Sequence, residues 1–193
     1  MKNNHIMIDL ETLSTQPNAH ILSIGAVAFS MDKGIVDEFY YCLGIGKQDR
    51  HVSLATVAWW MGQSLEARKV FEDPLDGCLP SALMRLHDFC SRSTLDGVCS
   101  RGTLDGVWAK GPSFDLVILE NAYKQYGINC PWPFWAHRDV RTIEFIFQSM
   151  GGLKSVLGTK RGTAHNALDD ARVQAQDVIG MMRFIDQVNN KIE

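Results

Sequence analysis

The first candidate chemistry lies at the end of an apolar strand, His5 to Thr12, where one residue separates Asp9 from Glu11. Side chains of a strand alternate between its two faces, so both carboxylates point the same way, with Cα atoms about 7 Å apart. Like charges this close repel each other unless a cation lies between them. Hard divalent cations prefer oxygen ligands. The pair predicts half of a metal site, although an acidic strand end in solvent would also be ordinary.

A third acid follows the short apolar segment that ends at Gly111 and Pro112. Ser113 is placed to cap the helix that comes next, and Asp115 falls in the first turn of that helix. Gly127 suits the position just after its last turn. An isolated acid here would most simply complement the helix dipole. Asp115 is therefore a candidate site residue only in combination with other acidic segments.

A histidine and an acid stand five residues apart near the start of the last expected helix. If both were helical, His165 and Asp170 would lie about 140° apart on the helix. They converge only if His165 belongs to the preceding loop. Asn166 supports this because it is a good N-cap, with Asp169 three residues later as in a capping box. We interpret Asp169 as a solvated acid, and His165 and Asp170 as site residues.

These segments together resemble one family. Asp9-Leu10-Glu11, Ser113-Phe114-Asp115 and His165-x-Ala167-x-x-Asp170-Ala171 match, in order, the three motifs of the DEDDh, or DnaQ-like, 3′–5′ exonucleases. The resemblance covers roughly residues 5 to 185. It looks closest to the phage and prophage branch, with its DexA-type and exodeoxyribonuclease VIII-like members. Relatives of that branch differ in whether they act on DNA or RNA.

The resemblance implies a ribonuclease H-like α/β fold, a mixed central sheet flanked by helices. It also implies hydrolysis of a single-stranded DNA or RNA 3′ end to nucleoside 5′-monophosphates with two Mg²⁺ or Mn²⁺ ions. Asp9, Glu11, Asp115 and Asp170 would be the metal ligands. His165 would be the general base, since an imidazole with a pKa near 6.5 accepts a proton readily at neutral pH.

The resemblance further implies residues that hold the substrate. The expected substrate-binding residues are Leu10, Thr12, Leu13, Phe114, Lys160 and Arg161. The first four would contact the terminal nucleotide, with a core position as the alternative for Leu10 and Phe114, and the two cations would bind phosphates. Trp59 and Trp60 also invite base stacking, but adjacent helical residues face different ways, so we expect one of them in the core.

Length and composition agree with an intracellular enzyme. A chain of 193 residues predicts a single domain. We find no signal peptide pattern and no apolar stretch long enough to span a bilayer. The five cysteines are odd in number and lack Cys-x-x-Cys spacing, which favours reduced thiols in the cytoplasm. The net charge of −3 includes the four site acids, so it does not exclude a nucleic-acid partner. Many relatives are dimers, so a homodimer is a further expectation.

The hydrophobic pattern predicts strands first and helices later. Three strands, at 5–12, 21–29 and 35–43, should form an antiparallel meander. The expected helices are 53–72 in one or two pieces, 79–91, 114–126, 141–150 and 167–189, with short strands near 106–110 and 134–138. Such an order indicates layers of helix and mixed sheet.

A nine-residue segment occurs twice in tandem. Residues 91–99 and 100–108 differ at only two positions. We interpret the first copy as a surface loop insertion and the second as the approach to a strand near Val107, because extra residues inside a strand would change which side chains face the core.

Two other functions fit parts of the pattern. The chain could be a nucleic-acid-binding module without activity, or a proofreading subunit that acts within a polymerase assembly. A metal-dependent nuclease assay discriminates the first, and co-purification with a polymerase would support the second.

Overall fold

The structure is a computed structural model that describes residues 4–46, 48–72, 77–93, 104–153, 157 and 165–190. A five-stranded sheet in the order β3-β2-β1-β4-β5 forms its centre. Its strands are β1 (His5–Thr12), β2 (Ile21–Ser30), β3 (Gly34–Cys42), β4 (Gly106–Ala109) and β5 (His137–Asp139). The first three pair in an antiparallel meander, while β4 and β5 run parallel to β1. The expected mixed sheet is confirmed.

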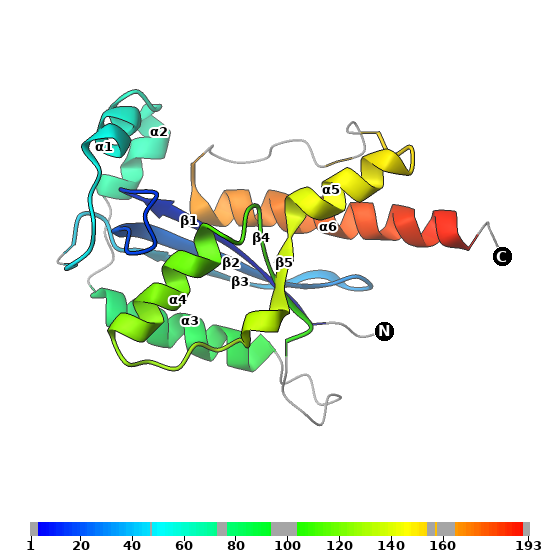
Figure 1. Ribbon diagram of the computed structural model, residues 1–193, viewed down its shortest axis with the longest axis horizontal. Coiled ribbons are helices and arrows are strands. Elements are labelled where there is room, and N and C mark those ends of the chain that lie inside the picture. The colour runs from blue at the N-terminus through cyan, green and yellow to red at the C-terminus, as the bar shows by residue number, and fades with distance from the viewer. Residues whose placement is uncertain are drawn as a thin grey trace.

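Helices cover both faces of this sheet (Figure 1). They are α1 (Leu54–Met61), α2 (Leu65–Arg68), α3 (Leu79–Ser93), α4 (Asp115–Gln125), α5 (Val140–Ser149) and α6 (Ala167–Asn189), with 3₁₀ turns η1 (Lys69–Phe71) and η2 (Phe134–Ala136). The α3–α4 pair lies on one face and the α5–α6 pair on the other. Among the described residues, no helix has the length and apolar character needed to cross a membrane.

Strand β1 divides its side chains between the two helical layers. Ile6 and Ile8 are fully buried in the apolar cluster that includes α3 and α4. Met7 is fully buried in the separate cluster formed with α5 and α6. Because side chains alternate along a strand, Asp9 and Glu11 continue the face of Met7 and point toward α6. The apolar even-numbered residues thus anchor the strand that carries the two acids.

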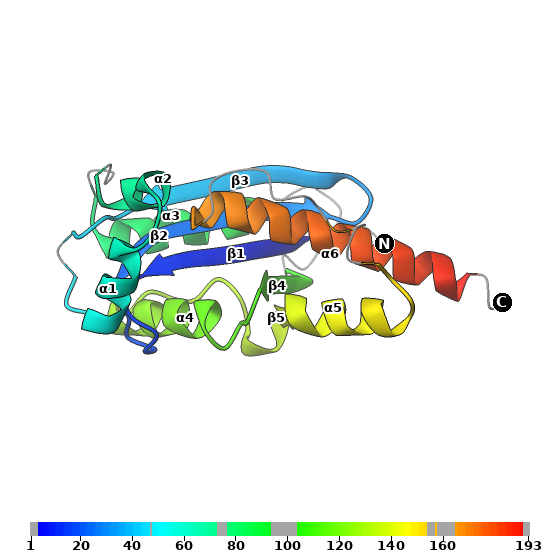
Figure 2. The same ribbon diagram turned by 90° about the horizontal axis from the view of Figure 1, so that it is seen from above.

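Helix α6 comes unusually close to the sheet at Gly25, which pairs with Asp9 across β1 and β2. A Cβ atom built on Gly25 would lie 2.2 Å from the backbone carbon and oxygen of Ala167, the first residue of α6. Figure 2 shows α6 lying along the sheet over β1 and β2. Glycine here lets the start of α6 approach the acidic end of β1.

The expected cap of α4 is wrong. Phe114, not Ser113, precedes the first helical residue, and it makes no side-chain capping bond. The reason is a turn in which the Phe114 amide donates to the carbonyl of Gly111 over 2.9 Å. Gly111 has φ +110°, a conformation that suits glycine. The turn begins the helix at Asp115, one residue later than a cap at Ser113 would place it.

The tandem repeat is only partly described. Its second copy does lead into a strand, since β4 begins at Gly106. The first three residues of the first copy, 91–93, form the end of α3 and not a loop, because the helical pattern of α3 continues through them. Residues 94–103 lie outside the described part, so a loop insertion stays a prediction.

We expect Gly25→Ala to damage both stability and activity, because the new methyl group must displace the backbone at the start of α6. Overpacking of this kind costs about 1–3 kcal/mol. Chemical denaturation and a nuclease rate measure the two effects. Gly180→Ala is the matched control, because Gly180 lies within α6 and a Cβ atom there meets no atom within 4 Å. Alanine in place of glycine should stabilise the helix by about 0.5–1 kcal/mol. Parent-like stability and rate in Gly25→Ala would contradict the close approach.

Candidate active site

The end of β1 supplies two of the predicted acids. Glu11 is buried and Asp9 half-buried. Glu11 pairs with Ser23 on β2, whereas Thr12 pairs with Ile21, so the pairing shifts register just after Glu11. Irregularities of this kind bend a strand and re-aim its side chains, and they are common beside active sites.

The third acid reaches β1 from the opposite helical layer. Asp115, the first residue of α4, is buried, and its Oδ1 accepts a hydrogen bond from the backbone amide of Leu10 over 3.1 Å. This bond fixes the start of α4 against the segment between Asp9 and Glu11. Three acids distant in sequence order thereby meet at one end of β1.

The loop before α6 supplies the histidine, as expected. Asn166 caps the helix, its side-chain oxygen accepting from the Leu168 and Asp169 amides over 3.1 Å. His165 precedes it with φ +63°, and its backbone amide donates to Oδ2 of Asp170 over 3.1 Å. The sharp turn brings residues five apart to the same place. Asp169 points elsewhere, as expected, and pairs with Arg172 at 2.7 Å.

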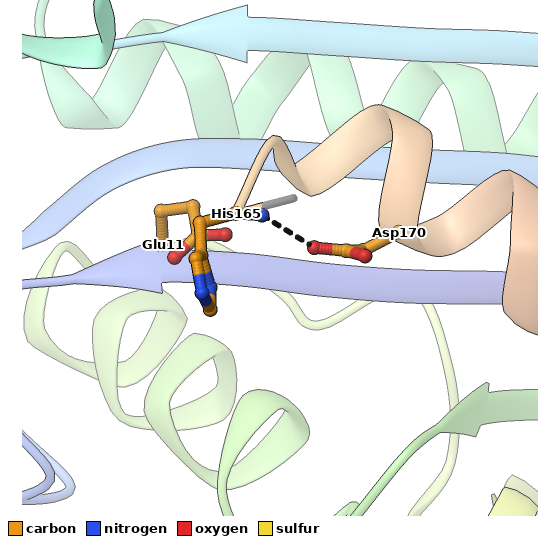
Figure 3. Close-up of side chains that lie close together, drawn as sticks. All are labelled: Glu11, His165 and Asp170. Carbon is orange, nitrogen blue, oxygen red and sulfur yellow. Dashed lines mark hydrogen bonds between the residues drawn. The ribbon is translucent and has the colours of Figure 1, made fainter. Parts of the chain in front are cut away.

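Figure 3 shows Glu11, His165 and Asp170 side by side, from β1 and from the start of α6. One potential ligand atom from each lies within 4.8 Å of the other two. Asp9 and Asp115 lie next to this group, because each interacts electrostatically with Glu11 and the two also act on each other. The structure therefore gathers all five residues proposed from the sequence.

The pKa values of three of these carboxyl groups are raised above their usual range. Burial, reinforced by the charges of Asp170 and Asp115, raises the pKa of Glu11 to about 8. Burial raises the pKa of Asp115 to about 7, although the Leu10 amide and the Arg141 guanidinium oppose this. The pKa of Asp9 is also raised well above its usual value, by burial and then by the charges of Asp115 and Glu11. Such a group needs either protons or a cation to offset its repulsion.

The donor set fits hard divalent cations. Carboxylate oxygens of Glu11 and Asp170 and a ring nitrogen of His165 lie close enough to share an ion, and the carboxylates of Asp9 and Asp115 interact with this group. A bound cation would reverse the electrostatic situation that raises these pKa values. Two of the four expected ligands, Glu11 and Asp170, thus lie close enough to share an ion.

A cleft of about 520 Å³ opens beside the acids. Its lining residues are Leu10, Glu11, Thr12, Thr15, Ser53, Ala55, Thr56, Trp59 and Phe114. Three expected substrate-binding residues, Leu10, Thr12 and Phe114, thus border it. Leu13 instead packs in the core cluster that contains Trp60. Lys160 and Arg161 lie outside the described residues.

The two adjacent tryptophans separate as expected. Trp60 is 2% exposed, and its indole nitrogen donates to the carbonyl of Thr12 over 2.9 Å, so it belongs to the core. Trp59 is 46% exposed and lines the cleft. The ring of His165 lies edge-on to Trp59, with 4.9 Å between ring centroids. Trp59 therefore contacts both the histidine and the cleft.

Two residues near the acids were missed in the sequence. Gln174 donates a hydrogen bond to Asp9, and Arg141 acts on Asp115 through its charge. For Gln174 a signal existed, because it follows Asp170 by four residues and so shares its helix face. For Arg141 none existed, since only the packing of α5 beside the turn at Gly111 brings it near.

Comparison with known proteins agrees with this geometry. The sequence matches the family described as "3'-5' exoribonuclease Rv2179c-like domain" over residues 4–182. It is 27% identical over 207 residues to the exodeoxyribonuclease of Enterobacteria phage T4, covering 92% of this chain and 87% of that protein.

Solved structures show the same fold. The nuclease domain of 3'hExo, a DEDDh family member bound to rAMP, superposes with a TM-score of 0.64 at 14% identity, covering 94% of this chain and 92% of that one. A zinc-bound complex of E. coli exonuclease I with single-stranded DNA gives 0.70 at 10% identity, covering 99% of this chain and 43% of that one. The ribonuclease H-like fold is thus confirmed, and one of these two structures, that of E. coli exonuclease I, holds a zinc ion. This chain belongs to the Rv2179c-like family of 3′–5′ exonucleases.

Proposed function

We propose that this exonuclease removes nucleotides from the 3′ end of single-stranded nucleic acid and releases nucleoside 5′-monophosphates with the help of two Mg²⁺ or Mn²⁺ ions. The observation that carries the proposal is the convergence of Glu11, His165 and Asp170 within 4.8 Å, beside Asp9 and Asp115. An acidic group with an imidazole at its edge suits hydrolysis of a phosphodiester.

Asp9, Glu11, Asp115 and Asp170 would hold the ions. Bound there, divalent ions neutralise charge that develops on the phosphate and make water more acidic. The carboxylates contribute by lying ready before the ions arrive. The Leu10 amide fixes Asp115, and the His165 amide fixes Asp170, so little rearrangement is needed at the moment of reaction.

His165 would take the proton from the attacking water. As the water oxygen bonds to phosphorus, the bond from phosphorus to the leaving 3′-oxygen breaks, and the imidazole ring holds the released proton. The loop before α6 and the edge of Trp59 limit where the ring lies. Its half-buried position lets the proton pass on to solvent after each cycle.

The cleft would receive the terminal nucleotide. Phe114 and Trp59 offer aromatic surface for a base. The Thr12 hydroxyl donates its proton to the carbonyl of Ser14 over 2.8 Å, so only its lone pairs remain. A hydrogen-bond donor on the ligand, such as a sugar hydroxyl, is therefore the complementary partner.

RNA is the second candidate substrate. The matching family is described by an exoribonuclease, whereas the phage relative is named an exodeoxyribonuclease. Digestion of 5′-labelled single-stranded DNA and RNA of matched sequence, with Mg²⁺ and with Mn²⁺, reports activity, polarity and sugar preference together. Duplexes with blunt ends provide the control for strandedness. No shortening of either strand would overturn the proposal.

The remaining expectations stay predictions. A homodimer is tested by light scattering of the purified protein, and a cytoplasmic location by fractionation of producing cells. Phosphate binding by Lys160 and Arg161 is tested by the salt dependence of KM in their alanine variants.

We expect Asp9→Ala and Asp115→Asn to lose nearly all activity while keeping the fold, because each change removes a ligand and its charge. EDTA should have the same effect on the parent. Circular dichroism and a single-turnover nuclease assay separate folding from catalysis. Asp88→Asn, which alters an exposed acid on α3, should match the parent. Undiminished activity in EDTA would refute the metal assignment.

We expect His165→Ala to lower kcat by about 10²–10⁴-fold with a smaller change in KM, because a general base acts in the transition state. His87→Ala removes an imidazole from the surface of α3 and should leave both constants unchanged. Steady-state kinetics at saturating metal tests the prediction. A kcat within twofold of the parent would assign the base role to another group.

We expect Mg²⁺ to raise Tm more as pH increases. Without metal, the folded protein holds protons on Glu11 up to about pH 8, whereas an unfolded glutamate releases them near pH 4.3. This term of the unfolding free energy therefore falls as pH rises through that window. Bound cations replace those protons.

Paired melting curves in EDTA and in Mg²⁺ between pH 5 and 8 test this expectation, with about 2–4 °C of Tm for each kcal/mol. Burial lowers the pKa values of His5 and His20, so these histidines make the protein more stable as pH rises, opposite to Glu11. Their effect is the same in EDTA and in Mg²⁺, and it cancels when the two melting curves at one pH are subtracted. Glu11→Gln should weaken the pH dependence of this difference, while Asp9 and Asp115, whose pKa values are also raised, keep part of it. A Tm difference that is independent of pH in the parent would contradict it.

A further inference from the structure

One buried amide beside the acids has no part in the reaction proposed above. Gln174 lies on α6 and is 9% exposed. Its Nε2 donates a hydrogen bond to Oδ1 of Asp9 over 2.8 Å, across the gap between α6 and β1. A glutamine carries no charge and cannot serve as the base, so its role must come through the group that it contacts.

The contact gives the Asp9 carboxyl group a hydrogen-bond donor on α6. An ionised carboxylate only accepts hydrogen bonds, and the amide NH₂ only donates. The bond therefore fixes the position of Oδ1 relative to α6. It also leaves lone pairs free, because each carboxylate oxygen has two and the amide uses one of those on Oδ1.

The oxygen of the same amide lacks a described hydrogen-bond partner. Oε1 of Gln174 is buried and finds no hydrogen-bond partner among the described residues. An unmade bond at a buried oxygen costs about 1–3 kcal/mol. Turning the amide over would present Oε1 to Asp9 in place of the donor, so the requirement of Asp9 for a donor fixes the amide in this orientation.

The neighbours of Gln174 leave its side chain little freedom. Ala171 and Ala175 on the same helix are fully buried against the sheet. Their small side chains let α6 lie close to β1, and a glutamine then spans the remaining distance to Asp9. Asp170, one turn earlier on the same helix, belongs to the cluster with Glu11.

We propose that Gln174 is a positioning residue that holds the Asp9 carboxylate in the orientation required to bind a divalent cation. This inference rests on the proposed metal site. Hydrogen bonds that orient ligating groups contribute about 10–100-fold to metal affinity or activity when removed. The alternative is a bond that only fastens α6 to β1, which would contribute to stability and not to cation binding.

Gln174→Met is the test variant, because methionine has nearly the same length and no donor. Gln174→Ala is the second variant if the first packs poorly. Gln176→Met is the matched control, since Gln176 is exposed on the same helix. Calorimetric titration with Mn²⁺, without nucleic acid, gives Kd. Melting in EDTA gives the stability of the metal-free protein, and kinetics at saturating Mn²⁺ gives kcat.

We expect Gln174→Met to weaken Mn²⁺ binding about 10–100-fold and the control to match the parent. Higher Mn²⁺ concentration should restore part of the lost activity. A lower Tm in EDTA with parent-like Kd and kcat, in whichever Gln174 variant folds, would overturn the inference and leave a purely structural bond. Absence of Mn²⁺ binding in the parent would instead overturn the proposed metal site, so the two failures are distinguishable.

Discussion

Mutual repulsion among buried carboxylates is the constraint on which this structure depends. Glu11 and Asp115 are nearly inaccessible to solvent, and Asp9 and Asp170 are close to them. Burial raises the free energy of each charged group, and proximity raises it further. A fold gains nothing from such an arrangement by itself. Its presence at the end of β1 is explained by the divalent cations that we propose to bind there.

The scaffold meets this constraint by separating anchoring from chemistry within one strand. The residues of β1 that face α3 and α4 are apolar and fully buried, so they hold the strand firmly. The residues that face α6 carry the acids. Gly25 then allows α6 to approach the adjacent strand within van der Waals contact. The site is thus assembled from rigid elements, which suits a reaction that requires ligands placed within about half an ångström.

Local patterns in the sequence were sufficient for most of the site. Strand alternation placed Asp9 and Glu11 on one face, and the Asn166 cap placed His165 in the loop. The family motifs then joined Asp115 to them. Patterns failed in two places: the local turn at Gly111 moved the start of α4 past Ser113, and long-range packing placed Leu13 in the core with Trp60.

Contacts between distant segments were harder still. The sequence predicts that one of Trp59 and Trp60 lies in the core, but it does not indicate which of the two indoles is buried. Gln174 carries a usable helical spacing, yet its hydrogen bond depends on how closely α6 crosses β1. Arg141 reaches the site from a helix whose position follows from β5, the shortest strand of the sheet.

The link between His165 and Asp170 joins the proposed base to one of the proposed metal ligands. A non-glycine residue at φ +63° is held in an unfavourable conformation, of order 1 kcal/mol. The hydrogen bond from its own amide to Asp170 offsets that cost. An ionised Asp170 accepts this bond best, and ionisation is also the state in which it binds a cation. If Asp170 binds a cation as proposed, the ionised form that binds the cation is also the form that best holds His165 in place.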